Sequence, residues 1–141
     1  MNTTSSPLPE QAQATVQALY AAFGRMDLPV FLGLLSPEVS WRFLGAPGLA
    51  YSRQATGREG VQAWLEDVLG LEDIQAFEPR TLHAGGDHVT VWGWERTTVK
   101  STGQTFECEW VHVFEVRDGL VTRFQGLYDT ARVAAAYAGK R

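Results

Sequence analysis

Apolar residues recur at helical spacing near the start of the chain. Between positions 10 and 26 they fall three or four residues apart, which predicts an amphipathic helix with one buried stripe. Asp27 can cap a second, short helix, and Pro29 fits the first turn of that helix. Because Ser36-Pro37 ends this pattern, we expect a helical hairpin before the first strand.

The pattern then changes to alternation, which predicts strands. Residues 38–43 alternate between polar and apolar side chains, as in a strand with one buried face. A loop with Gly and Pro, residues 45–57, follows. Within it Thr56-Gly57-Arg58-Glu59 has the form of a capping box, so a third amphipathic helix is expected from there to about Gly70.

Alternation resumes over the second half of the chain. The turns between these segments are short, so the strands are expected to form an antiparallel meander. A final Ala-rich helix should follow over residues 131–137. The predicted fold class is α+β: a strongly curved antiparallel sheet with a mixed first strand, closed on one side by three helices around a pocket. The four segments are 74–83, 89–99, 106–116 and 120–128.

Composition supports one globular domain. Of the 141 residues, 45% are hydrophobic and 20% charged, and no apolar run is long enough to span a membrane. We expect a disordered tail over residues 1–9 and a single domain over residues 10–141. The first ten residues resemble no signal peptide, so a cytoplasmic location is expected.

Charge and cysteine content exclude several classes of partner. The net charge of −4, without a basic stripe, argues against nucleic acid and against an anionic membrane. Cys108 is the only cysteine, which excludes an intramolecular disulfide and a zinc site built on paired thiols. We expect it to be a small buried hydrophobe.

Two titratable residues are predicted to meet inside the pocket. If residues 101–104 form a hairpin turn, Glu95 lies opposite Trp110 and Gly93 lies opposite His112, all on one face. Glu95 would then be a diagonal neighbour of His112 and could orient the imidazole or act as a base. A structural salt bridge or hydrogen bond is the alternative interpretation.

The opposite face of the same strands mixes large apolar and charged side chains. Such a face is typical of a subunit interface rather than of a surface exposed to water alone. We therefore expect a homodimer formed through the outer side of the sheet. The residues predicted for this interface are Trp92, Trp94, Val111 and Val113.

Aromatic residues are numerous enough to predict a small apolar or aromatic ligand, although aromatics at such spacing also serve as ordinary core. Tyr51 lies in the loop and could cover the cavity mouth. His83 and His88 flank Asp87, but this spacing matches no metal-ligand motif, and no phosphate-binding loop appears. No metal and no cofactor are expected. The candidate ligand-binding residues are Tyr20, Trp41, Phe43, Tyr51, Trp64, Trp110, Phe124 and Tyr128.

The order of elements and several short motifs resemble a known superfamily. The motifs are Trp41 on the first strand, the run 109–114 (EWVHVF), the turn 117–119 (RDG) and residues 128–131 (YDTA). Together they resemble the nuclear transport factor 2-like (NTF2-like) superfamily and, within it, the SnoaL-like, ketosteroid-isomerase-related bacterial proteins. The resemblance implies a cone-shaped α+β barrel, homodimers packed through the outer sheet face, and a hydrophobic pocket. It also implies varied activities: isomerases, dehydratases, polyketide cyclases, epoxide hydrolases and binding modules.

Site residues carried over from this resemblance match only in part. The protonated oxyanion-hole aspartate of ketosteroid isomerases falls on His112, and their helix tyrosine falls one place from Tyr20. Their proton-shuttling aspartate falls on or beside Phe43, which cannot abstract a proton. The similar polyketide cyclases imply a pair made by His112 and Asp129, although Asp129 could instead cap the final helix.

Two functions therefore stay open. The first is a cofactor-independent isomerase, lyase or cyclase, in which His112 is a general acid or electrophile and Glu95 orients it or acts as the base. Tyr20 or Tyr128 would hydrogen-bond a carbonyl oxygen. The second is a non-catalytic ligand-binding or dimeric interaction module that uses the same pocket.

Overall fold

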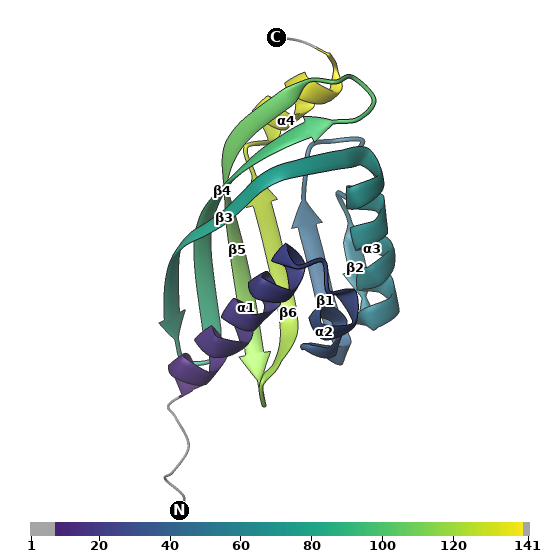
Figure 1. Cartoon of the computed structure of the whole chain (residues 1–141). Helices are drawn as coiled ribbons and strands as arrows, with labels where there is room; N and C mark the ends of the chain where they lie inside the picture. Colours follow the sequence, from purple (N-terminus) through teal and green to yellow (C-terminus); the bar gives the residue numbers. More distant parts are fainter. Residues whose placement is uncertain (1–7, 140–141) are drawn as a thin grey trace, which may run out of the picture.

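The computed structural model describes residues 8–139, which form a curved sheet with helices against its concave side (Figure 1). No helix in this part of the chain is long and apolar enough to cross a membrane. The elements, in order, are α1 (Leu8–Gly24), α2 (Leu28–Gly33), β1 (Leu35–Leu44), β2 (Gln54–Thr56), α3 (Gly57–Leu71), β3 (Glu72–Gly85), β4 (His88–Val99), β5 (Thr105–Arg117), β6 (Leu120–Tyr128) and α4 (Thr130–Tyr137).

The sheet confirms the predicted meander and the α+β class. Its strand order is β2-β1-β6-β5-β4-β3, and β3 to β6 pair antiparallel in sequence order. β1 pairs parallel with β6 and so makes the sheet mixed. The closed barrel implied by the resemblance is wrong, because β2 and β3 remain the two edges of an open sheet. α3 connects these edges directly and covers the side between them (Figure 1).

β3 wraps around the helices because its pairing with β4 is interrupted twice. Register shifts occur between Ile74 and Ala76 and between Pro79 and Thr81. A bulge bends a strand and increases its twist, and a proline is tolerated there because no ladder hydrogen bond needs its missing N–H. The resulting bend gives the concave face on which the helices pack.

The ends of the first two helices differ from the predictions. α1 begins at Leu8, so Pro9 belongs to its first turn and not to a tail, a position that suits proline. The rest of the predicted tail lies outside the described residues. Asp27 caps α2 as predicted by accepting from the Val30 amide, but α2 ends at Gly33 and Ser36-Pro37 already lie in β1.

Two predictions for the loop of residues 45–57 are wrong. The loop contains the short strand β2, which pairs antiparallel with β1. Thr56 precedes α3 but its side chain makes no capping hydrogen bond. The cause is that Thr56 is the last residue of β2, and the chain turns into the helix at Gly57, whose φ is +76°.

The predicted register of β4 and β5 is wrong by two positions. The ladder ends at Thr98 opposite Thr105, because Val99 and Gln104 close a wider turn than the one expected from residues 101–104. Glu95 therefore lies opposite Cys108, and Trp110 lies opposite Gly93. A shift by an even number keeps every side chain on its predicted face.

Trp110 lies against the sheet at a position that only glycine allows. A Cβ added to Gly93 would stand 2.2 Å from a ring carbon of Trp110. We expect Gly93→Ala to lower the free energy of unfolding by about 1–3 kcal/mol, since the indole would have to leave its place in a packed core. Chemical denaturation measures this loss.

Gly85→Ala is the matched control, because Gly85 is also a strand residue and a Cβ there meets nothing within 4 Å. Its stability should stay close to that of the wild type. Equal losses of stability in Gly93→Ala and Gly85→Ala would show that the close contact with Trp110 is not the reason for glycine at position 93.

Candidate functional site

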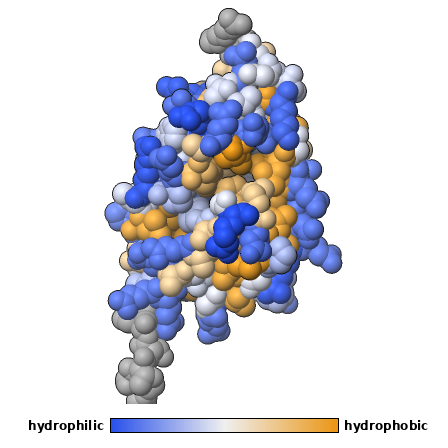
Figure 2. Space-filling view, in the orientation of Figure 1, coloured by the Kyte–Doolittle hydropathy of each residue, from blue (hydrophilic) through white to orange (hydrophobic). Residues whose placement is uncertain are grey.

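A cavity of about 80 Å³ lies between the concave face of the sheet and the helices. In Figure 2 apolar surface gathers in the middle of the corresponding face, between α1 and α3. The structure places all of the predicted ligand-binding residues in the lining of this cavity, and His112 and Glu95 with them. These ligand-binding residues are Tyr20, Trp41, Phe43, Tyr51, Trp64, Trp110, Phe124 and Tyr128.

A surface groove adjoins the cavity between the end of α1 and the start of β3. The groove and the cavity share part of their lining, so a molecule in the groove contacts the same side chains as one inside. The shared residues are Tyr20, Phe23, Glu72, Ile74 and Phe77.

His112 and Tyr20 form the polar pair at one end of the cavity. The Tyr20 hydroxyl lies 2.7 Å from Nδ1 of His112, which joins α1 to β5. The imidazole is 8% exposed and stacks on Trp110 with ring centroids 4.0 Å apart. Burial lowers the pKa of His112 to about 3, so the ring is neutral near pH 7.

Because the His112 ring is neutral, only one of its two nitrogens carries a hydrogen. Burial raises the pKa of Tyr20, so its hydroxyl keeps its proton and can donate to Nδ1 of His112. In the tautomer that accepts at Nδ1, His112 carries its own proton on Nε2 and offers this N–H to the apolar cavity, while Tyr20 holds the ring in place.

Glu95 lies at the other end of the cavity, so the predicted Glu95–His112 pair is wrong. His112 is opposite Val91, four residues before Glu95 on β4, which separates the two backbones by roughly 13 Å. Glu95 instead accepts a hydrogen bond from the Thr97 hydroxyl at 2.7 Å. Burial, together with the nearby charge of Glu72, raises the pKa of Glu95 to about 7 despite that bond.

A second polar cluster, formed by Tyr51, Glu72, Tyr128 and Tyr137, was missed by the sequence analysis. The Tyr51 and Tyr137 hydroxyls donate to the same Glu72 oxygen, at 2.5 and 2.6 Å, and Tyr51 also bonds Tyr128. Burial raises the pKa of Glu72 although these hydrogen bonds favour its charged form. Tyr51 is buried, not a mobile cover, and its carbonyl accepts from the Trp64 indole.

The sequence offered only one weak signal for this cluster. Glu72 lies two residues before the apolar Ile74, a spacing that puts both side chains on one face of an extended strand. The strand, however, was expected to begin only at Ile74. Tyr51 and Tyr137 come from a loop and from α4, so no local periodicity connects them with Glu72.

Asp129 does not lie in the cavity. Its carboxylate accepts from the Arg132 amide at 3.2 Å and caps α4, which supports the capping interpretation. The side chain is 46% exposed and is ion-paired with Arg132. Cys108 is buried, as expected, and burial raises the pKa of its thiol to about 12.

Two indole N–H groups in the cavity wall have no partner. Nε1 of Trp41 and Nε1 of Trp110 are buried and make no hydrogen bond within the described part of the chain. Buried donors are normally paired, and an unpaired one costs free energy. Two side chains of the cavity wall therefore each keep an unpaired donor.

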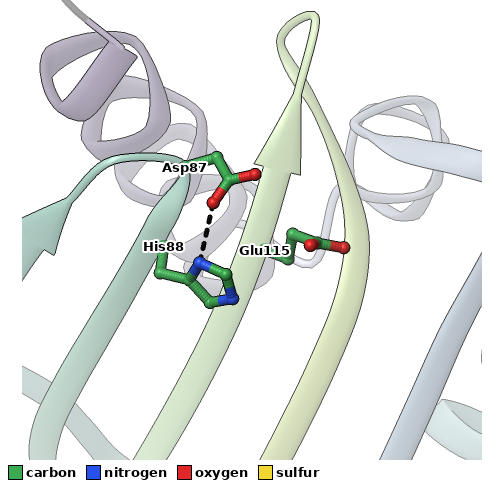
Figure 3. Close-up of side chains that lie close together, drawn as sticks. All are labelled: Asp87, His88 and Glu115. Carbon is green, nitrogen blue, oxygen red and sulfur yellow. Dashed lines mark ion pairs between the residues drawn. The ribbon is translucent and has the colours of Figure 1, made fainter.

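A group of potential metal ligands lies outside the cavity, near the turn that joins β3 to β4 (Figure 3). Asp87 and His88 are ion-paired at 2.7 Å, and Glu115 lies beside them on β5. Arg117 also pairs with Asp87 and Glu115, at 3.3 and 3.1 Å. Since this guanidinium contacts both carboxylates, ion pairs among these side chains account for the cluster.

Comparison with known proteins gives a family match over most of the chain. The family profile described as "SnoaL-like domain" matches residues 16–124. No curated protein sequence matches the chain.

Solved structures share the fold over nearly the whole chain. An NTF2-like protein of Burkholderia xenovorans is 29% identical, with 91% of this chain and 96% of that chain covered and a TM-score of 0.82. A Bacillus subtilis protein provisionally described as an isomerase is 20% identical, with 96% and 98% covered and a TM-score of 0.80. A Xanthomonas campestris protein provisionally described as a polyketide cyclase is 24% identical, with 89% and 98% covered and a TM-score of 0.72. The last two show the fold alone.

The two ends of the cavity predict opposite effects of pH on stability. From pH 6.5 down to 3 the unfolded chain protonates His112 while the folded chain does not, so this residue lowers stability as the pH falls. From pH 4.5 up to 7 the folded chain keeps the Glu95 proton that the unfolded chain has lost, so Glu95 lowers stability as the pH rises.

Single variants should separate these effects. Relative to wild type, His112→Gln should gain about 2 kcal/mol of stability on going from pH 6.5 to 5, and Glu95→Gln should lose a similar amount. Urea denaturation at several pH values gives both slopes. Parallel pH profiles for the wild type and the two variants would contradict the assigned protonation states.

Proposed function

The chain belongs to the SnoaL-like family, and from this premise we propose that it binds a small, mainly apolar or aromatic molecule that carries a carbonyl or hydroxyl oxygen. We further propose that it catalyses cofactor-independent proton transfer on that molecule, as an isomerase, lyase or cyclase does. A cytoplasmic location belongs to the same proposal.

The contact between Tyr20 and His112 carries this proposal. It places a neutral imidazole, fixed by a 2.7 Å hydrogen bond, inside a cavity with an almost wholly apolar wall. In such a dry site a hydrogen bond to a developing oxyanion is stronger than in water. A histidine with a purely structural role needs no groove beside it. His112, in contrast, lines a cavity that shares lining residues with a surface groove.

His112 is the group that would contact the reacting oxygen. Its Nε2–H would donate to a carbonyl oxygen and stabilise the negative charge that grows there when a proton leaves a neighbouring carbon. Tyr20 would act as a positioning residue, because its hydroxyl is used on Nδ1 and sets both the tautomer and the ring orientation.

Glu95 is the candidate for moving the proton. With a pKa of about 7 it is present in both forms near neutral pH, which suits a general acid or base. Because it lies about 13 Å from His112 along the sheet, both residues can act on one molecule only if that molecule extends along the cavity.

A non-catalytic binding protein is the second candidate, and Phe43 favours it. In the ketosteroid-isomerase pattern the proton-shuttling carboxylate falls on or beside this position, yet the Phe43 ring packs 5.0 Å from Tyr128 in the cavity wall. On this reading the cavity holds its ligand by apolar contact and by the His112 hydrogen bond, without turnover.

The test is a ligand and turnover screen on wild type, Tyr20→Phe and His112→Gln. Cyclic ketones, aromatic polyketides and epoxides are first ranked by thermal shift, and those that bind are then assayed for conversion. We expect His112→Gln to reduce kcat by about a hundred-fold and Tyr20→Phe by about ten-fold, as for the loss of an oxyanion donor and of its support.

Exposed His83 provides the control, since His83→Gln removes an imidazole far from the cavity lining. It should leave binding and kcat unchanged. Ligands that bind wild type without any conversion, and bind more weakly to His112→Gln, would replace catalysis by the binding function.

The homodimer expected from the sequence is also a proposal. Trp92 is 50% exposed on the outer face, where its indole donates to Glu109, and Trp94 lies between Arg80 and Arg96. Exposed aromatic and arginine side chains are enriched at protein interfaces.

Sedimentation velocity tests this interface. We expect a dimer for wild type and a monomer for Trp92→Glu, because a carboxylate would be buried without a partner. Val30→Glu alters a similarly exposed apolar residue on α2 and should leave the dimer intact. A wild-type monomer at high micromolar concentration would exclude this dimer.

A further inference from the structure

Glu72 and Glu95 are two buried carboxyl groups without a basic partner. They are 4% and 6% exposed, and both line the cavity. None of the ion pairs in the described part of the chain includes either residue, and no Lys or Arg lines the cavity there. Buried carboxylates are normally paired, so this end of the cavity lacks a positive charge.

Each carboxyl group has one oxygen left for a ligand. Both hydroxyls that bond Glu72 donate to Oε2, and the Thr97 hydroxyl donates to Oε1 of Glu95. A carboxylate can accept more than one hydrogen bond at each oxygen. The other oxygens can therefore accept from a donor that enters the cavity.

The wall beside these carboxyl groups is aromatic. Phe43 contacts Trp64 and Tyr128, with ring centroids 5.6 and 5.0 Å apart, and Tyr128 is tied to Glu72 through Tyr51. The face of an aromatic ring attracts a cation, most strongly where water is excluded. An ammonium group would thus meet rings as well as carboxylates.

The indole N–H groups of Trp41 and Trp110 are a second unsatisfied polar feature of the cavity wall. Both side chains are more than nine-tenths buried in the cavity wall, and neither N–H has an acceptor. The cavity therefore has free carboxylate acceptors at the Glu72 and Glu95 end, inside a wall that also contains two unpaired donors. An ammonium group would satisfy the acceptors.

We propose that the cavity binds an organic cation, a mainly aromatic or apolar amine whose ammonium group pairs with Glu95 and Glu72. This inference rests on the proposed function for its pocket, because it specifies the class of molecule that enters it. Binding of the cation depends on Glu95 and Glu72, whereas the proposed catalysis depends first on His112.

The charge state of the site gives the proposal a distinctive signature. Glu95 titrates near neutral pH, and its proton is held by burial and by the charge of Glu72. A bound ammonium group would favour the ionised carboxylate, so binding near pH 7 should release a proton and should tighten as the pH rises toward 8. The other titratable groups at this end, Cys108, Tyr51, Tyr128 and Tyr137, have raised pKa values and stay neutral there.

The experiment compares 2-phenylethylamine with 2-phenylethanol, which has nearly the same shape without the charge. Isothermal titration calorimetry of the full chain at pH 8 should show at least about ten-fold tighter binding of the amine. Glu95→Gln and Glu72→Gln should each remove most of this preference and leave the affinity for the alcohol nearly unchanged. Benzylamine with benzyl alcohol, and 1-naphthylmethylamine with its alcohol, repeat the test at other sizes.

Glu107→Gln is the matched control, since Glu107 is an exposed carboxylate paired with Arg96 on the outer face. It should keep the preference for the amine. Titrations of the wild type at pH 7 in two buffers with different ionisation heats should show proton release, which a purely structural role of Glu95 would not produce.

The proposal is overturned if no amine of the series binds, if amine and alcohol bind equally, or if Glu95→Gln retains the preference. These outcomes are separate from failure of the proposed catalysis. An amine that binds wild type and His112→Gln alike without turnover would support the cation site and contradict the catalytic role of His112.

Discussion

Trp110 can lie flat against the sheet only because residue 93 has no side chain, and the rest of the site depends on this contact. The indole covers Gly93 and stacks between Phe77 and His112, with ring centroids 4.6 and 4.0 Å away. This stack excludes water from the imidazole and so keeps it neutral, which lets Tyr20 bond to it from α1. One glycine on β4 thereby sets the protonation of a residue on β5 and helps to hold a helix over the sheet.

Much of the fold, and the face on which each site residue lies, could be predicted from the sequence. Glu95, Trp110 and His112 were placed on one face by assuming a hairpin turn at residues 101–104, and they share the concave face because the register differs by an even number of residues. The register itself depends on the turn between Val99 and Gln104, whose width the residue types leave open. An error of two positions in the register left both side chains on the predicted face but separated Glu95 from His112. Predicting a contact between two residues therefore requires the exact register, whereas predicting which residues line a cavity does not.

Contacts between distant segments were beyond prediction for a different reason. The cluster around Glu72 needs a loop residue, Tyr51, and a residue of the last helix, Tyr137, to reach one carboxylate. Each of these side chains appears locally as an ordinary aromatic residue. The short strand β2 was missed similarly, because it is defined by its pairing with β1 and not by an alternating pattern of its own.

Burial shifts the pKa values of His112 and Glu95, at the two ends of the cavity, in opposite directions. Burial removes the charge from His112 by lowering its pKa to about 3 and from Glu95 by raising its pKa to about 7. At slightly acid pH His112 and Glu95 are therefore both uncharged, which is the less costly state for groups in a dry interior. Above pH 7 only the glutamate end gains charge, because His112 is already deprotonated. A ligand of the proposed kind would thus contact a neutral imidazole at one end of the cavity and, at the other, a carboxyl group that ionises near neutral pH, so the two ends of the cavity favour different chemical groups.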